Sequence, residues 1–167
     1  MLREKTGASI SEVRNALVSA DGDIARALQI LERSLGERGS RKAERETKQG
    51  IVDCYVHSDR KIGVLVEVLC ETDFVARTSE FKALAHDIAL HIAAMNPLYI
   101  RKEDIPQEVI EAERGTIENP DKHFADVSLL TQPFVKNADK TVGEVLAEAA
   151  GKFGENIRIG RFIRFAL

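Results

Sequence analysis

Residues 51–70, IVDCYVHSDRKIGVLVEVLC, decide the fold. Apolar residues recur there with a period of two on both sides of the polar segment SDRK at 58–61. Val52, Cys54 and Val56 share one face of the first run, and Ile62, Val64, Val66, Val68 and Cys70 share one face of the second. This pattern predicts a β-hairpin with its turn at 58–61. The turn pairs Cys54 with a residue near 65, so Cys70 lies too far along its strand for a disulfide, and both thiols are predicted on buried faces.

Helical periodicity follows the hairpin. Apolar residues at positions 81, 84, 85, 88, 92 and 95 predict a long helix closed by Asn96-Pro97, and Pro106 opens a helix that runs to about Arg114. Residues 115–123 are predicted as a loop, Thr141 caps another helix, and residues 157–167 alternate as a terminal strand that Arg161 interrupts. Residues 50–167 are therefore predicted to form an α+β core domain, with a three-stranded antiparallel sheet and helices on one of its faces.

Residues 1–36 predict a small helical domain. A stub at 2–5 precedes two helices capped by Ser11 and Asp23, and Gly36 is placed to end the second of them. A unit of this size seldom folds alone without a metal, a disulfide or a partner, and it contains no Cys or His, so we expect it to dock on a partner. The polar segment 37–49 is predicted to be a linker.

Composition excludes several classes of protein. Hydrophobic residues make up 44% of the 167 positions and charged residues 31%, which is typical of a globular chain. Lys and Arg number 24 against 27 Asp and Glu, so the net charge of −3 predicts no general affinity for nucleic acid. No apolar run is long enough to span a membrane, and the start of the chain lacks the apolar stretch of a signal peptide, so we expect a cytoplasmic protein.

The search for catalytic and metal-binding motifs is negative. The chain has no glycine-rich phosphate loop and no GxSxG or HExxH sequence. Its histidines, at 57, 86, 91 and 123, fall on separate elements or faces, and His91 is predicted to be a hydrogen-bonded core residue. We therefore expect no catalytic residue, no metal and no cofactor, and the protein is not predicted to be an enzyme.

The segment CETDFVAR at 70–77 stands between the hairpin and the long helix. Either Thr72 or Asp73 can cap a helix. Phe74 lies seven residues before Phe81, so on a continuous helix it joins the core. Alternatively Thr78-Ser79 interrupts the helix, and Phe74 is then an exposed aromatic side chain at a tip. Periodicity leaves both possibilities open.

Several stretches resemble the elongation factor Ts family, which exchanges guanine nucleotide on the translation factor EF-Tu. They are EVLCETDFVAR at 67–77, LREKTGASISEVRNAL at 2–17, DIALHIAAMNPLYI at 87–100, SLLTQPFVKN at 128–137 and KFGENIRIGRFIRF at 152–165. The resemblance implies a ubiquitin-associated-like three-helix domain at 1–36, followed by a single core repeat.

The resemblance also implies the residues that contact EF-Tu. Thr72, Asp73, Phe74 and Val75 match the stretch that lies against the nucleotide domain of EF-Tu, where the ring disturbs the Mg²⁺ and phosphate-binding site and GDP leaves. Arg3 and Ile10 match contacts in the N-terminal domain, and Phe153 and Gly154 match a further contact turn in the core. Two structural interpretations stay open, because Ile10 could pack in its own small bundle and Gly154 could be a helix C-cap.

Departures from the family leave other possibilities open. Members usually carry helical residues before the Leu2-Arg3 pair and a further helical stretch between Glu113 and Phe124, so an arm is predicted to be deleted here. With one core repeat, a second copy of the chain, in a homodimer or a 2:2 complex with EF-Tu, would supply the missing contacts. The alternatives are a ubiquitin-associated-type adaptor, which needs only residues 1–36, and a thiol enzyme, which needs an accessible cysteine of low pKa.

Overall fold

The computed structural model describes all residues, 1–167. The N-terminal part contains α1 (Leu2–Thr6), α2 (Ile10–Ser19) and α3 (Ile24–Ser40). The sheet consists of β1 (Gln49–Val56), β2 (Ile62–Cys70) and β5 (Arg158–Ala166). Between β2 and β5 lie α4 (Asp73–Ala76), α5 (Ser79–Met95), α6 (Gln107–Arg114), α7 (Pro120–Asp126), β3 (Pro133–Phe134), β4 (Asn137–Thr141) and α8 (Val142–Phe153), with 3-10 turns at Lys102–Asp104 and Leu129–Thr131.

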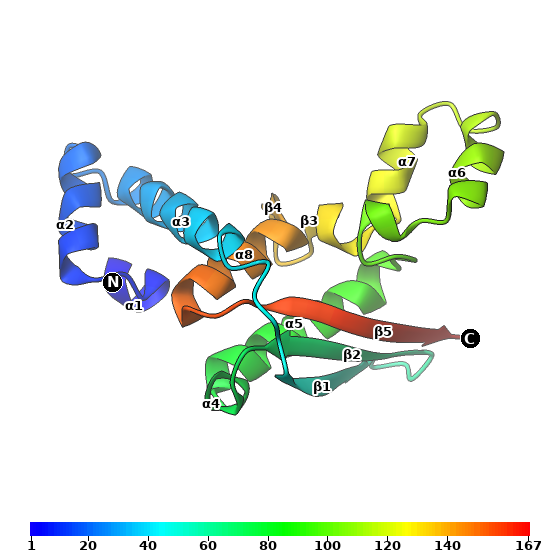
Figure 1. Cartoon of the computed structure of the whole chain (residues 1–167), viewed down its shortest axis with the longest axis horizontal. Coiled ribbons are helices and arrows are strands. Elements are labelled where there is room, and N and C mark those ends of the chain that lie inside the picture. Colours follow the sequence, from blue (N-terminus) through cyan, green and yellow to red (C-terminus); the bar gives the residue numbers. More distant parts are fainter.

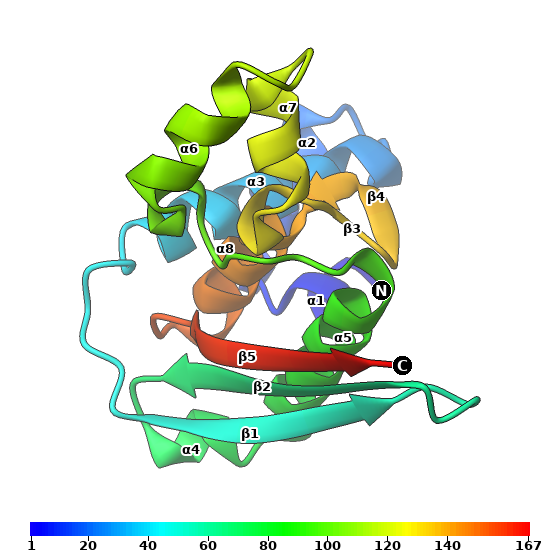
Figure 2. The ribbon, with the colours of Figure 1, turned by 90° about the vertical axis from the view of Figure 1, so that its right-hand side faces the viewer.

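The sheet has the order β1-β2-β5 with both pairings antiparallel, which confirms the predicted α+β architecture. Helix α5 packs on one face of the sheet, and β5 lies alongside β2 (Figures 1 and 2). The predicted inward face of β2 is confirmed, because Val64, Val66, Val68 and Cys70 are buried against α5 residues such as Ile88. This core of aliphatic side chains supplies most of the apolar burial that stabilises the domain.

The prediction for β1 is wrong about which face is buried. The predicted pairing of Cys54 with residue 65 is confirmed, since Cys54 lies opposite Leu65. Directly opposed residues of antiparallel strands share a face, and Leu65 points away from α5, so Cys54 is exposed with it. Tyr55, which contacts the His86 ring, lies on the inner face instead.

A bulge changes the faces of β5 halfway along the strand. Val66 pairs with Phe162 and Val68 with Ile159, so β5 holds one residue more than β2 between the two pairs. Ile159 is buried before the bulge, and after it Phe162 takes the inner face while Ile163 and Phe165 become exposed. An extra residue in one strand inverts the alternation beyond it, which is the structural basis of the interruption at Arg161.

Helix α3 does not end at Gly36, as predicted, but at Ser40. Its C-terminal half packs on α8 (Figure 1). At Gly39 an added Cβ would lie 1.8 Å from the carbonyl oxygen of Ala147, and at Gly151 one would lie 2.1 Å from that of Leu35, so the two backbones touch. The predicted docking partner of the N-terminal helices is thus supplied by this chain's own α8. The division into 1–36, 37–49 and 50–167 stays a prediction, and α3 crosses its first boundary.

A half-buried lysine reinforces this junction. Lys140 of β4 forms ion pairs of 3.0 Å with Glu32 of α3 and with Glu148 of α8. Burial raises the pKa of the Glu148 carboxyl, and the lysine opposes that shift. The three side chains connect β4, α3 and α8 at one point.

Two further local predictions are settled by capping groups. The cap of α2 is Ser9 and not Ser11, because Ser9 and Glu12 form a reciprocal capping box. The segment 115–123 is not entirely loop: Asn119 caps α7 and Pro120 occupies its first turn. Helices α6 and α7 project together at the end of the molecule opposite α1 and α2 (Figure 1), and the deletion of a further helical stretch relative to the family stays a prediction.

His91 is a buried core histidine, as predicted. Its Nδ1 accepts a hydrogen bond from the Val135 amide at 3.1 Å, so its Nε2 carries the proton and donates to Gln132 Oε1 at 2.9 Å. Burial lowers the pKa of His91, because the charged form would lose its hydration.

Candidate functional site

Two successive helix caps build a tip, defined as residues 72–76, between β2 and α5. Thr72 caps α4, and Thr78 caps α5 by accepting a hydrogen bond from the Phe81 amide at 3.2 Å. The Thr78 hydroxyl also donates to the carbonyl oxygen of Val75 at 2.8 Å. The helix is therefore interrupted, and the single turn of α4 does not share the phase of α5.

Phe74 is exposed at this tip, with 82% of its surface accessible. The core interpretation of its spacing from Phe81 is wrong, because the interruption rotates Phe74 away from the apolar stripe of α5. Val75 and Ala76 are buried in the main core and anchor the turn. An exposed phenylalanine on an anchored turn is typical of a side chain that docks into a partner.

Asp73 lies beside the ring and is also exposed. Its carboxylate forms an ion pair of 2.8 Å with Arg77, one turn along the chain. Both side chains are mostly in solvent, where such a pair contributes little to stability. Asp73 can therefore exchange this pair for a partner's polar group at small cost. Val75, in contrast, is buried, so of the four matched residues it supports the tip and does not line its surface.

The turn after α8 lies next to the tip. Gly154 has a left-handed φ of 77° and its amide donates to the Ala150 carbonyl, so the C-cap interpretation of Gly154 is confirmed. The half-buried ring of Phe153 meets Phe81 edge-on, with their centroids 6.0 Å apart. Phe153 therefore joins the core beneath the tip.

Glu155, which follows Gly154, was missed by the sequence analysis. Its carboxylate accepts hydrogen bonds from the amides of Glu71 and Thr72 and from the Thr72 hydroxyl. No local motif marks Glu155, because its partners lie more than eighty residues earlier in the chain.

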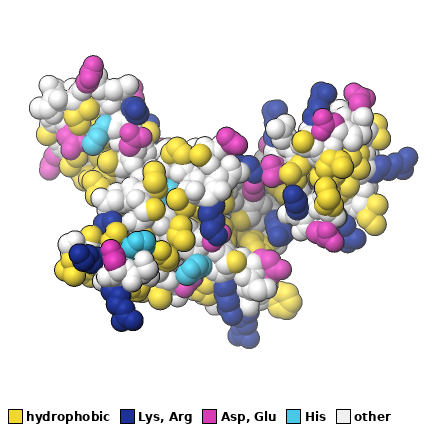
Figure 3. All heavy atoms as spheres, turned by 180° about the vertical axis from the view of Figure 1, so that it is seen from behind, with side chains coloured by type: hydrophobic (Ala, Val, Ile, Leu, Met, Phe, Trp, Pro, Cys, Tyr) yellow, Lys and Arg dark blue, Asp and Glu magenta, His cyan; other side chains and the backbone are white.

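A second exposed surface lies on the N-terminal helices. We call it the N-terminal patch, and it is lined by Ile10, Val13, Leu17 and Val18, with Arg3 at its other border. Ile10 is 72% exposed, so the interpretation that it packs in its own bundle is wrong. Hydrophobic side chains gather on this part of the molecule in the space-filling view (right in Figure 3). Arg3 and Ile10, selected separately in the sequence, flank one apolar surface.

The N-terminal patch and the tip both lie away from the α6–α7 arm. In Figure 1, α1 and α2 lie at the left, α4 lies below them and nearer the middle, and the α6–α7 arm lies toward the right. The α3–α8 junction connects the two surfaces, because α8 leads directly into the turn that holds the tip. A partner of sufficient size could contact both surfaces at once.

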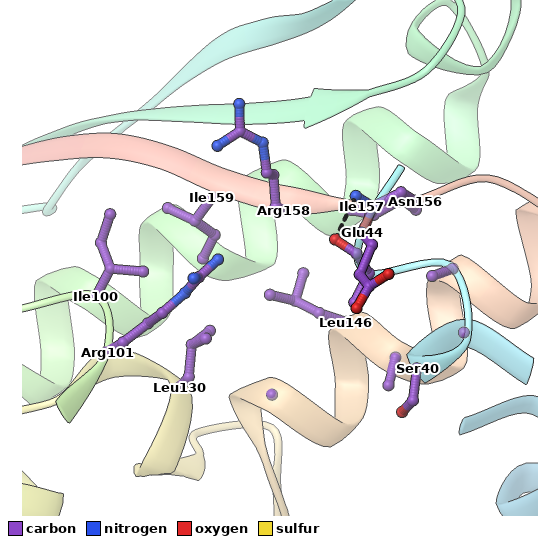
Figure 4. A pocket seen from close by; sticks show the side chains of 15 residues that line it. Ser40, Glu44, Ile100, Arg101, Leu130, Leu146, Asn156, Ile157, Arg158 and Ile159 are labelled. Atoms are coloured by element: carbon purple, nitrogen blue, oxygen red, sulfur yellow. Dashed lines mark hydrogen bonds between the residues drawn. The ribbon is translucent and has the colours of Figure 1, made fainter. Parts of the chain in front are cut away.

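The cavities show no catalytic arrangement. One of about 380 Å³ lies between α3, α8 and β5, with an apolar floor that includes Leu146 and Ile159 and with Arg101 and Arg158 beside it (Figure 4). No group of three or more His, Cys, Asp or Glu side chains converges as metal ligands would. Burial also raises the pKa of the Cys70 thiol, which opposes formation of the nucleophilic thiolate. None of the helices has the length and apolar character that crossing a membrane requires.

Comparison with known proteins identifies close relatives. A family model described as elongation factor TS matches residues 1–123. The chain is 45% identical to an elongation factor Ts from Carboxydothermus hydrogenoformans, over 99% of this chain and 85% of that protein. It is also 45% identical to one from Thermodesulfovibrio yellowstonii, over 98% and 91%, and 44% identical to one from Pseudothermotoga lettingae, over 98% and 92%. The residues matched by the family model include both the N-terminal patch and the tip.

Proposed function

The chain belongs to the elongation factor Ts family of translation elongation factors, and on that premise we propose that it binds EF-Tu carrying GDP and promotes the release of that GDP. The observation that carries the proposal is the exposure of Phe74 on a turn whose neighbours are buried. EF-Tu, in its GDP-bound and nucleotide-free forms, is the proposed partner. The proposed place of action is the cytoplasm, and neither a nucleic acid nor a membrane takes part in the proposed contact.

The proposed mechanism is mechanical and electrostatic. In a GTPase, Mg²⁺ and the backbone amides of a loop hold the phosphates of the nucleotide. These contacts depend on close distances between charges, so a small displacement weakens them substantially. Phe74 would enter between helices of the EF-Tu nucleotide domain and move that site, with Asp73 beside it and Thr72 and Val75 holding the turn.

The other contacts would hold the partner in place. Arg3 and Ile10 would bind EF-Tu through the N-terminal patch, and Gly154 would permit close approach at the turn beside the tip. Binding on a second surface supplies affinity without opposing the movement of the nucleotide site. The chain breaks and forms no covalent bond in this scheme, so it is an exchange factor and not an enzyme.

Release of labelled GDP from EF-Tu, measured with and without this chain, tests the proposal. We expect faster release and no hydrolysis of nucleotide. Because the coupling between two ligands is reciprocal at equilibrium, GDP should weaken binding of the chain by the factor by which the chain weakens binding of GDP. Unchanged release at a saturating concentration of the chain would refute the proposal.

The N-terminal patch also favours a second candidate, a ubiquitin-associated-type adaptor without exchange activity. This candidate gives no role to the tip. It predicts that Ile10→Glu abolishes binding of the partner while Phe74→Ala changes nothing. The exchange factor requires both surfaces, so the two substitutions distinguish the candidates in one binding assay.

A second copy of the chain is the proposed occupant of the outer face of the sheet. Val52, Val56, Leu65, Ile163 and Phe165 are exposed there, on the face that α5 does not cover. A two-fold axis would bring the same rows of apolar side chains against each other in a self-complementary contact. The complex with EF-Tu would then contain two copies of each chain.

A further inference from the structure

Glu155 connects two segments that are far apart in the sequence. Its Oε2 accepts hydrogen bonds from the backbone amides of Glu71 and Thr72, at 3.1 and 3.0 Å. Its Oε1 accepts one from the Thr72 hydroxyl at 2.5 Å. All three donors belong to Thr72, the first residue of the tip, and to Glu71 just before it. Glu155 itself takes part in no ion pair, so these hydrogen bonds are the contacts that its charge makes.

The bond to the hydroxyl also orients the cap of α4. A threonine hydroxyl has one proton, and Thr72 gives it to Glu155. The lone pairs of the oxygen are then free to face the Val75 amide, which approaches to 3.5 Å. Removal of the carboxylate would leave the hydroxyl free to rotate, and the cap of α4 would lose its fixed acceptor.

A reciprocal set of bonds fixes the position of Glu155. The amide of the next residue, Asn156, donates to the carboxylate of Glu71 at 2.6 Å, and Arg45 pairs with that carboxylate at 3.6 Å. The Asn156 side chain donates to the carbonyl oxygens of Ala43 and Arg45, and Figure 4 shows the first of these bonds as a dashed line. We call Glu71, Thr72, Glu155 and Asn156 the clamp. It connects the tip, the turn after α8 and the segment that follows α3.

We propose that Glu155 is a positioning residue for nucleotide exchange, because it holds the tip in the orientation in which Phe74 meets EF-Tu; this inference rests on the proposed function. Helix α4 is four residues long, far below the length at which a helix is stable without tertiary contacts. Val75 and Ala76 anchor its end, and the clamp anchors its start. Without Glu155 the tip must be ordered when the partner binds, which weakens association.

Glu144 provides a matched control at the opposite end of α8. Its carboxylate accepts hydrogen bonds from the Thr141 amide at 2.7 Å and from the Thr141 hydroxyl at 3.0 Å, as Glu155 does with Thr72. Glu144 lies at the start of α8 and Glu155 just beyond its end. Glu144→Ala therefore removes a similar pair of bonds without touching the tip.

The experiment measures GDP release from EF-Tu with the wild-type chain, Glu155→Ala, Glu155→Gln and Glu144→Ala. We expect Glu155→Ala to lower kcat/KM for release by about tenfold or more. Glu155→Gln keeps one carbonyl acceptor for the two amides and should retain an intermediate activity. Glu144→Ala should stay within about twofold of the wild type, even if it lowers the melting temperature as much as Glu155→Ala.

A double-mutant cycle distinguishes positioning from a general loss of stability. If Glu155 acts through Phe74, then Glu155→Ala should cause little further loss in a Phe74→Ala chain. Amide hydrogen exchange of the free chain gives a second readout, because Glu155→Ala should accelerate exchange at 71–77 and not within β2.

The assignment of Glu155 would be overturned if the Glu155→Ala chain promoted GDP release as fast as the wild type. It would also be overturned if Glu155→Ala lowered GDP release by the same factor in the Phe74→Ala chain as in the wild type. If the wild-type chain does not accelerate the release of GDP from EF-Tu, the proposed function fails instead. Hydrogen exchange still reports on the clamp in that case, because it needs no EF-Tu.

Discussion

Phe74→Ala should separate binding from folding. The side chain is 82% exposed, so folding removes only about a fifth of its surface from water. Full burial of a phenylalanine stabilises a protein by about 1.5–3 kcal/mol, and the corresponding share for Phe74 is at most about 0.5 kcal/mol. For a chain of this size, that loss lowers the melting temperature by about 1–2 °C.

The same substitution should strongly impair the complex with EF-Tu. An aromatic side chain that enters a partner's pocket commonly contributes about 2 kcal/mol or more, which corresponds to roughly a thirtyfold change in an equilibrium constant. Stopped-flow release of fluorescent GDP measures this loss, and thermal unfolding of the same sample measures stability. We expect a large loss in exchange activity beside a nearly unchanged melting temperature.

Two control substitutions make the result specific. Phe81→Ala removes a ring with no accessible surface and should cost about 3–5 kcal/mol of stability. Leu98→Ala removes an apolar side chain that is 62% exposed and lies away from the tip. This substitution should change neither the rate of GDP release nor the melting temperature. A Phe74→Ala chain that is strongly destabilised, and whose folded fraction exchanges nucleotide normally, would show that Phe74 belongs to the core and not to the interface.

Three further predictions concern the fold and its assembly. Burial lowers the pKa of His91, so the unfolded chain binds a proton on this imidazole more readily than the folded chain does. The free energy of unfolding should therefore be constant above about pH 6.5 and fall below that pH, by at most about 1.4 kcal/mol per pH unit. Urea denaturation at a series of pH values measures this loss. Gly151→Ala places a methyl group against the Leu35 backbone and should cost about 1–3 kcal/mol in thermal unfolding, whereas Gly36→Ala meets open space within a helix and should stabilise by up to about 1 kcal/mol. Leu65→Glu places a charge on the outer face of the sheet and should shift the sedimentation coefficient to that of a monomer; if the wild type already sediments as a monomer, the proposed dimer is wrong.

Local patterns predicted most elements of the fold because each element is specified by neighbouring residues. The alternation at 62–70 and the stripe at 81–95 give both the elements and their buried faces. The outer position of Cys54 could have been predicted as well, because pairing with residue 65 places it on the face opposite Val64 and Val66. The Asn119-Pro120 pair is likewise a helix start that the sequence contains.

Other features depend on contacts that no local pattern records. The continuation of α3 through Gly36 depends on its packing against α8, which outweighs the weak helix propensity of glycine. Heptad spacing left both a core position and an exposed position open for Phe74, and only the resemblance to a family favoured its exposure. Glu155 was missed because its bonds to the tip cross more than eighty residues.

The backbone contacts at Gly39 and Gly151 make the N-terminal patch and the tip parts of one body. Once the patch has bound a partner, the tip is presented to the same molecule at a fixed separation, so its contact no longer depends on the concentration of the free chain. Each surface can then bind weakly by itself while the two together bind well. The proposed exchange factor must leave its partner after each round of nucleotide exchange, and this combination suits that task because release of either surface is enough to begin dissociation of the complex.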